Sequence, residues 1–196
     1  MSTYINIAAG LKYAKETYPH KRAIVCPAGK DARGRARYTQ MTFTQLDQAS
    51  DRLAFGLERA GITRGTRTIL MVMPGIEFFT IIFAMLKVGA VPVVVDPGMG
   101  LKRMLLCLSE GKPFAFIGIE KAHLLRVLRP GYFKTVKHWV TVGRRWCWGG
   151  YTLDQLYADT NEPYHSAKTT KNETTPNTNK LIEKIQQGNI IHDKIP

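Results

Sequence analysis

The chain has 196 residues, of which 44% are hydrophobic, and carries 28 lysines and arginines against 15 aspartates and glutamates. This length and apolar content suffice for one ordinary domain, with or without a tail, and exclude a globally disordered chain. The basic excess lies mostly before residue 164 and favours encounter with phosphates, nucleotides or acidic surfaces, although net charge alone does not define a site.

Hydrophobic periodicity and turn residues divide the chain into helices and strands. In chain order the predicted elements are a helix over residues 4–18, strands over 23–26 and 38–43, a helix with an apolar stripe from Leu46 to Ala60, a strand over 68–73, a helix over 74–88, a strand over 91–95, a helix over 101–109, a strand over 114–119, a helix over 122–128, a strand over 139–142 and a weak helix over 152–158. Thr42 or Thr44 is expected to cap the second helix and Gly61 to end it. Residues 27–37 are expected to form a long exposed loop that joins the first two strands into a hairpin.

The alternation of strands and helices after residue 67 indicates the fold class. Residues 68–73 and 91–95 are continuous apolar runs, typical of strands buried on both faces, and a helix separates them, as a parallel pair requires. The prediction is an α/β fold: an open, mostly parallel sheet with flanking helices, preceded by an N-terminal β-hairpin. Because composition changes abruptly, we expect one domain over residues 1–163 and an unrelated, disordered polar tail over 164–196.

The cysteines and histidines form no metal or catalytic pattern. Cys26, Cys107 and Cys147 are widely spaced and odd in number, which excludes a disulfide framework and a zinc site and predicts buried structural thiols. The histidines have no paired spacing, and each, including His123, is expected to lie at the surface or half-buried. The absence of a signal peptide pattern and of a long uninterrupted apolar run predicts a cytoplasmic protein without a transmembrane segment.

Two loops share features with nucleotide-binding segments. Gly98 and Gly100 follow a predicted strand as a dinucleotide-binding loop would, but Arg103 replaces the third glycine and no acidic residue ends a following strand. In the other loop, Arg144 and Arg145 stand beside tryptophans and could stack on a base, but we expect the commoner arrangement, a cation over an aromatic ring within the loop. No P-loop sequence is present, and no specific nucleic-acid binding is predicted.

Two short segments resemble the signatures of a known family. Residues 41–46, Met-Thr-Phe-Thr-Gln-Leu, resemble the first signature of adenylate-forming enzymes, and residues 86–92, Leu-Lys-Val-Gly-Ala-Val-Pro, followed by an Asp-Pro pair, resemble the second. The chain is thus similar, over roughly residues 5–157, to the N-terminal part of the AMP-dependent acyl-CoA synthetase/ligase superfamily. The family-signature residues are Thr42, Phe43, Leu46, Leu86, Lys87, Gly89, Ala90, Pro92, Asp96 and Pro97.

Physical roles of these residues are expected to be structural. Gly89 suits a left-handed helix terminus, and Pro92 is tolerated at the start of a strand where no ladder donor is needed. Asp96 is expected to cap the helix near Leu101, with a ligand contact at the carboxyl end of a strand as the alternative. Residues 96–100 and 143–150 are most similar to the fatty-acid-CoA-ligase-like branch that includes the β-lactone synthetases of olefin biosynthesis.

The resemblance implies an ATP- and magnesium-dependent activation of a fatty or β-hydroxy acid to an acyl adenylate. In the family this chemistry uses a glycine-rich phosphate loop, a Thr-Glu pair, an aspartate on the ribose and a C-terminal lysine, none of which has a match in this sequence. No catalytic, nucleotide-binding or metal-binding residue, and no cofactor, is therefore assigned to the chain itself. The prediction is a truncated fragment that is inactive alone.

Two other functions remain open from the sequence. The chain could be a non-catalytic basic α/β module that binds a nucleotide, an acidic partner or a membrane surface. Alternatively, a separate chain that carries the missing nucleotide site could complement it, which would make the pair an enzyme.

Overall fold

A parallel sheet lies at the centre of the structure, a computed structural model that describes residues 7–94, 100–157 and 164. Its five strands run in the order β4-β3-β5-β6-β7, and every neighbouring pair is parallel. The strands are β3 (Arg67–Met71), β4 (Val91–Val94), β5 (Ala115–Ile119), β6 (His138–Val142) and β7 (Tyr151–Thr152). The predicted α/β class with a parallel sheet is confirmed.

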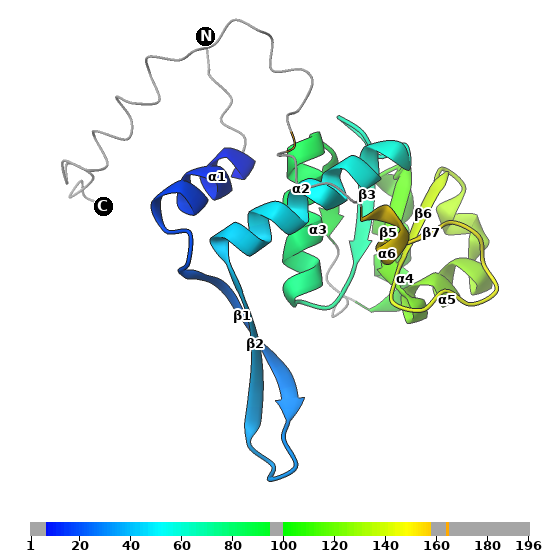
Figure 1. Ribbon diagram of the computed structural model, residues 1–196. Coiled ribbons are helices and arrows are strands. Elements are labelled where there is room, and N and C mark those ends of the chain that lie inside the picture. The colour runs from blue at the N-terminus through cyan, green and yellow to red at the C-terminus, as the bar shows by residue number, and fades with distance from the viewer. Residues whose placement is uncertain (1–6, 95–99, 158–163, 165–196) are drawn as a thin grey trace, which may run out of the picture. The chain divides into compact units, whose positions relative to one another are not determined.

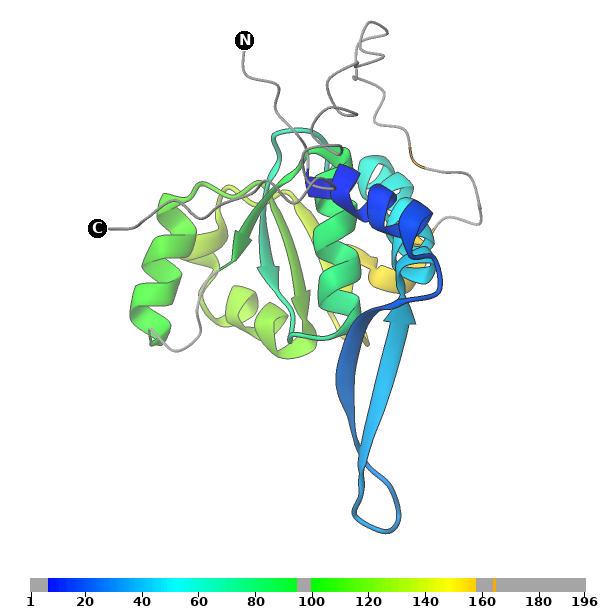
Figure 2. The same ribbon diagram turned by 90° about the vertical axis from the view of Figure 1, so that its left-hand side faces the viewer.

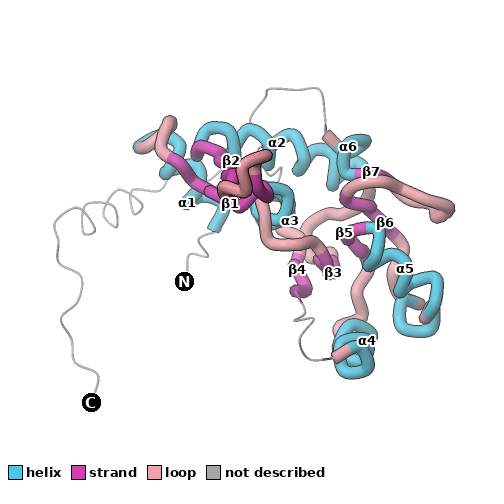
Figure 3. Tube along the Cα trace, turned by 90° about the horizontal axis from the view of Figure 1, so that it is seen from below, coloured by secondary structure: helices cyan, strands magenta, loops and turns pink. Residues whose placement is uncertain are grey.

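Helices cover both faces of this sheet, as Figure 3 shows. The helices of one face are α2 (Phe43–Arg59), α3 (Ile76–Val88) and the short α6 (Leu153–Leu156); those of the other are α4 (Leu101–Glu110), α5 (Glu120–Leu128) and the 3-10 turn η2 (Pro130–Phe133). Within one strand, adjacent side chains enter opposite cores: Leu70 packs with α2 and α3, whereas Ile69 packs with α4. Burial on both faces explains why these strands are continuous apolar runs in the sequence.

The N-terminal part of the structure is a helix followed by a hairpin (Figures 1 and 2). α1 (Ile7–Thr17) lies beside α2, and β1 (Arg22–Lys30) pairs antiparallel with β2 (Ala36–Thr42). The end of the hairpin nearer the helices contributes the buried Ile24 to a small core with Leu11 and Leu46. Its far end extends away from the helices and the parallel sheet, and both of its faces are exposed.

The predicted long loop at residues 27–37 is wrong, because both strands continue into it and only a short turn remains. The Asp31 carboxylate closes this turn by accepting hydrogen bonds from the backbone N–H groups of Arg33 and Arg35, at 2.8 and 2.9 Å. The sequence does not alternate between polar and apolar residues in this segment because neither face is buried. The predicted helix over 152–158 is also shorter than expected and ends at Leu156, while the two-residue strand β7 and the turn η2 were not predicted.

Candidate functional site

The carboxyl edge of the parallel sheet is the candidate functional site. β4 lies on one side of β3 and β5 on the other, so the chain reverses direction across the sheet between β3 and β5. Open α/β sheets bind ligands outside the carboxyl ends of their strands, at such a switch point. Here β3 leads through an exposed Met73 to α3, and β5 passes directly into α5 at Glu120.

The carboxylate of Glu120 holds the next loop of this edge in place. Its Oε1 accepts a hydrogen bond from the Arg144 backbone N–H at 2.7 Å. Gly143 adopts a φ of +91°, and a Cβ there would come within 3.0 Å of the same oxygen. The glycine and the carboxylate together fix where the chain leaves β6, so Glu120 positions a loop and is not a free ligand group.

Tryptophans and arginines of the loop over residues 143–150 are divided between the core and the surface. The Trp148 indole N–H donates to the Thr141 hydroxyl at 3.1 Å, and its ring stacks on His123 with centroids 5.4 Å apart. Trp146 is 59% exposed, and the Arg145 guanidinium donates to the carbonyl of Gly150.

The predicted cation–π contact within this loop is wrong for the part of the chain that the structure describes. The cation over an indole is Arg126, 3.8 Å from the centroid of Trp139, and both residues lie outside the loop. The guanidinium of Arg145 instead donates a hydrogen bond to the backbone carbonyl of Gly150.

His123 was expected at the surface or half-buried, and this prediction is wrong. The imidazole is fully buried, and its Nε2 donates to the carbonyl of Val140 at 3.0 Å, which fixes the tautomer. Burial lowers the pKa of His123 below its ordinary value, so the ring is neutral inside the core. It is a buried core residue behind the loop.

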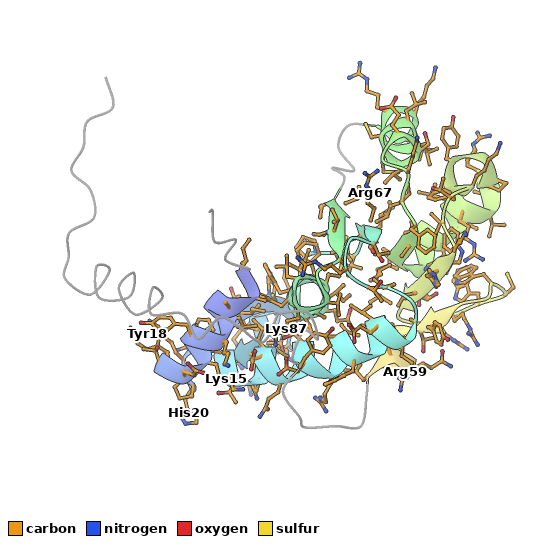
Figure 4. The ribbon with its side chains drawn as sticks, turned by 90° about the horizontal axis from the view of Figure 1, so that it is seen from above. Lys15, Tyr18, His20, Arg59, Arg67 and Lys87 are labelled. Carbon is orange, nitrogen blue, oxygen red and sulfur yellow. The ribbon has the colours of Figure 1, made fainter. Side chains whose placement is uncertain are left out.

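Lys87 of the second signature is a buried cation clamped between helices. Its ammonium donates to the Oδ1 atoms of Asp47 and Asp51 on α2, each at 2.7 Å, and to the backbone carbonyl of Asp47 at 2.9 Å. Lys15 on α1 reaches the other oxygen of Asp47 at 2.7 Å. Figure 4 labels Lys15 and Lys87, both beside α2. This ion cluster, Lys15–Asp47–Asp51–Lys87, therefore ties three helices together.

Electrostatics within the ion cluster favour its charged state. Burial alone raises the pKa of Asp47, but the hydrogen bonds and charges of Lys15 and Lys87 outweigh it, and the net pKa lies below the ordinary carboxyl value. The hydrogen bond to Asp47 in turn raises the pKa of Lys15. Sequence reasoning identified Lys87 and missed its partners. The available signal was a pair of aspartates at i,i+4 spacing in an amphipathic helix, an arrangement that is unfavourable without a cation between them.

The first signature builds the start of α2. Thr42 is the N-cap: its hydroxyl accepts from the Gln45 N–H at 3.3 Å, and the Gln45 side chain accepts from the Thr42 N–H at 2.9 Å, which completes a capping box. Thr44 instead donates its hydroxyl to the carbonyl of Pro19. Phe43 and Leu46 pack in the small core that α1, α2 and the near end of the hairpin form together.

The second signature ends α3 and starts β4. Gly89 adopts a φ of +75°, and the N–H groups of Gly89 and Ala90 donate to Leu86 and Met85, which is a Schellman motif. Pro92 lies in β4, an edge strand, opposite Thr68 of β3. The expected roles of Gly89 and Pro92 agree with these positions. Asp96 and Pro97 lie outside the described residues, so the predicted cap stays a prediction.

The three cysteines were expected to be buried, and this is wrong: Cys107 and Cys147 are exposed and Cys26 is half-buried. Cys107 lies on the outer face of an amphipathic helix, where apolar type does not ensure burial. Among the described residues no group of His, Cys, Asp and Glu is arranged to hold a metal ion. Nor is any helix of those residues long and apolar enough to cross a membrane.

An apolar groove of about 520 Å³ lies beside α1, between β1 and α3. Its lining includes Ile7, Leu11, Val25, Phe79 and Phe83. Ile7 and Val25 are exposed, at 68% and 50%. None of its described lining residues belongs to the parallel sheet.

Comparison with known proteins identifies the family. A sequence model of the family described as AMP-binding enzyme matches residues 11–179. An olefin β-lactone synthetase of Xanthomonas campestris is 45% identical over 160 residues, which cover 81% of this chain and 29% of that protein. An olefin β-lactone synthetase of Stenotrophomonas maltophilia is 46% identical over 159 residues, or 80% of this chain and 28% of that protein. The chain thus spans less than a third of the length of these curated relatives.

Solved structures of two ligases have a similar fold. A putative long-chain-fatty-acid CoA ligase of Rhodopseudomonas palustris matches with a TM-score of 0.65 at 18% identity, over 82% of this chain and 38% of that one. Coronafacic acid ligase of Pectobacterium brasiliense matches with a TM-score of 0.63 at 16% identity, over 82% and 30%. The family match extends past residue 163, and the domain boundary predicted there stays a prediction. With the signature residues in the positions described above, this chain belongs to the family of AMP-binding enzymes.

Proposed function

We propose that the chain is the N-terminal part of a ligase that activates a fatty or β-hydroxy acid as an acyl adenylate, at the expense of ATP and with magnesium. The observation that carries this proposal is the 45% identity with an olefin β-lactone synthetase over 160 residues. A β-lactone forms when the hydroxyl of a β-hydroxy acid closes on its activated carboxyl group, which is why β-hydroxy acids join plain fatty acids as candidate substrates.

The chain's own contribution to this reaction is structural. Adenylation needs a cradle for the triphosphate and its metal, because charge develops on the phosphoryl oxygens in the transition state. The carboxyl edge of the sheet instead presents a carboxylate, Glu120, engaged with the loop after β6. We therefore expect the chain to shape one wall of the intact ligase, in the cytoplasm, and to have no adenylating activity by itself.

Release of pyrophosphate tests the activity. The purified chain is supplied with ATP, magnesium and either a long-chain fatty acid or a β-hydroxy fatty acid, and an intact olefin β-lactone synthetase serves as the positive control. We expect pyrophosphate from the intact enzyme and none above the no-acid background from the chain. Acid-dependent release by the chain alone would overturn its assignment as inactive.

Complementation tests whether the chain belongs to a working ligase. The chain is mixed with the separately produced remainder of the Xanthomonas relative, the part that lies beyond the matched 160 residues. Pyrophosphate release by the mixture, and by neither part alone, would support the proposed role and the possibility of a complementing partner. If the mixture releases no more pyrophosphate than the remainder alone, the result would count against the proposed role.

A further inference from the structure

We propose that a basic hollow at the amino ends of β3 and β5 binds a compact polyphosphate anion. The hollow has a volume of about 430 Å³ and is lined by Arg64, Gly65, Thr66, Arg67, Lys112 and Phe114. Arg67 opens β3 and Phe114 immediately precedes β5, so the hollow lies at the end of the sheet opposite to the carboxyl edge. It is thus separate from the candidate site, although Gly65 at its edge donates a hydrogen bond to the carbonyl of the signature residue Gly89, and the inference goes beyond the proposed function.

Cations from two segments far apart in the sequence meet in this hollow. Arg64 lies in the turn before β3, Arg67 in the strand, and Lys112 in the turn after α4. No carboxylate is among the described residues that line it. Cations gathered without a counter-charge repel one another, and a multivalent anion placed between them removes that repulsion and gains charge-assisted hydrogen bonds.

The arginine in the strand is held in place before any ligand arrives. The Arg67 Nη1 donates to the carbonyl of Gly111 at 3.2 Å, which ties the strand to the turn that carries Lys112. Figure 4, which looks onto the amino ends of the strands, shows Arg67 beside β3 and α4. A guanidinium tethered at one nitrogen loses less conformational freedom on binding, and its remaining N–H groups suit phosphate oxygens.

A further cation stands beside the hollow. The Lys137 ammonium lies 5.2 Å from the ring centroid of Phe114, which lines the hollow. This ammonium adds to the positive potential without occupying the hollow itself. The arrangement favours a ligand with several negative charges in a small volume, which is the chemistry of a di- or triphosphate and not of a single carboxylate.

The backbone conformation of Lys112 is a second feature of the hollow. With a φ of +43°, Lys112 is the non-glycine residue with a positive φ among the described residues. Pro113 follows it, and a residue before proline is restricted to extended conformations. Glycine would adopt this φ without strain, so the position holds a lysine side chain against the preference of its backbone. Strain of this kind concentrates at binding sites.

Calorimetric titration of the full chain with pyrophosphate at low ionic strength tests the proposal. We expect saturable binding that Lys112→Gly, Lys112→Asn and Arg64→Gln each weaken about tenfold, as the loss of one charge-assisted contact predicts. The control is Lys12→Gln, which also removes one positive charge, from an exposed residue of α1 that does not line the hollow. It should change the affinity less than twofold. Lys112→Gly should also raise the melting temperature because it relieves the strained φ.

The combination of higher stability and weaker binding separates the proposal from simple unfolding. Equal weakening by Lys12→Gln and Lys112→Gly would overturn it, since only net charge would then matter. Binding of citrate as tight as that of pyrophosphate would also overturn it. An ATP arm identifies the source of the phosphates: binding of both ATP and pyrophosphate supports the proposal, whereas binding of ATP alone contradicts it. A chain without adenylating activity can still bind pyrophosphate here, so this result is independent of the proposed function.

Discussion

Lys87 lies in the core of the structure, and its 8% exposure leaves its ammonium dependent on Asp47 and Asp51 for solvation. A lysine in a family signature invites a catalytic reading, but the ammonium is fully engaged with α2. The resemblance identified the residue, whereas its role required the three-dimensional positions of partners about 40 residues away in sequence.

Replacing Lys87 with methionine tests the ion cluster. The variant keeps the length of the side chain and leaves two buried carboxylates without their shared cation, so we expect the free energy of unfolding to fall by about 3 kcal/mol. Urea denaturation measures this change, with Lys12→Met on the exposed side of α1 as the matched control, expected to change it by less than about 0.5 kcal/mol.

A second replacement distinguishes charge from packing in the same cluster. In Lys87→Met, Asp47 keeps its ion pair with Lys15 while Asp51 loses its cation, so adding Asp51→Asn removes the uncompensated carboxylate and should restore part of the lost stability. Equal stabilities for Lys87→Met and Lys12→Met, or a double variant weaker than the single one, would contradict the assignment.

Acid should lower the free energy of unfolding because the unfolded chain protonates His123 more readily than the folded chain does. The folded pKa of His123 lies below the ordinary 6.5, because burial disfavours the imidazolium. At a pH between the folded and the unfolded pKa, the unfolded chain binds a proton at His123 that the folded chain does not bind. The contribution of His123 to the free energy of unfolding is therefore complete above pH 6.5 and is lost as the pH falls below that value. The free energy of unfolding of the wild type, measured by urea denaturation, should therefore be lower at pH 5.5 than at pH 7.5.

The control for this pH dependence is a second histidine. His123→Phe removes the titrating ring and should flatten the profile over that pH interval, even if its absolute stability is lower. His20→Phe replaces an exposed histidine and should keep the wild-type slope. Parallel profiles for the wild type and His123→Phe would show that another group causes the loss.

At the scale of the elements, local sequence predicted where helices start and stop. The capping box at Thr42 and the Schellman motif at Gly89 lie in the first and second signatures, and both satisfy backbone groups that a helix end leaves free. The hairpin could be predicted only in part, because its outer strands bury no face and so carry no periodic pattern.

Two glycine-to-alanine substitutions should change stability in opposite directions. Gly89→Ala places a Cβ at a φ of +75° and 3.1 Å from the Arg64 Cγ, so we expect a loss of about 1–2 kcal/mol. Gly10→Ala lies within α1, where a Cβ meets nothing within 4 Å, and should add about 0.5–1 kcal/mol. Thermal unfolding measures both; a stabilising Gly89→Ala would contradict the described helix terminus.

At the scale of the whole molecule, the order β4-β3-β5-β6-β7 determines which loops meet. It places the end of β3 beside the end of β5 at one edge, where the pyrophosphate-release experiment probes the chemistry of the intact ligase. It places Arg67 and Phe114 at the other edge, where the polyphosphate titration applies. The strand order therefore keeps the carboxyl edge and the basic hollow at opposite ends of the sheet, so each can be tested without the other.

The sequence by itself determined the family, the α/β class and the helix ends, because signatures, apolar runs and caps depend on residues close together in the chain. It did not determine the burial of His123, the exposure of Cys107 or the partners of Lys87. Those depend on which helices pack side by side, and no local pattern encodes a contact between residues far apart in sequence. The basic hollow also arose only from tertiary structure, since parallel strands bring their amino ends together and with them cations that the sequence keeps well apart.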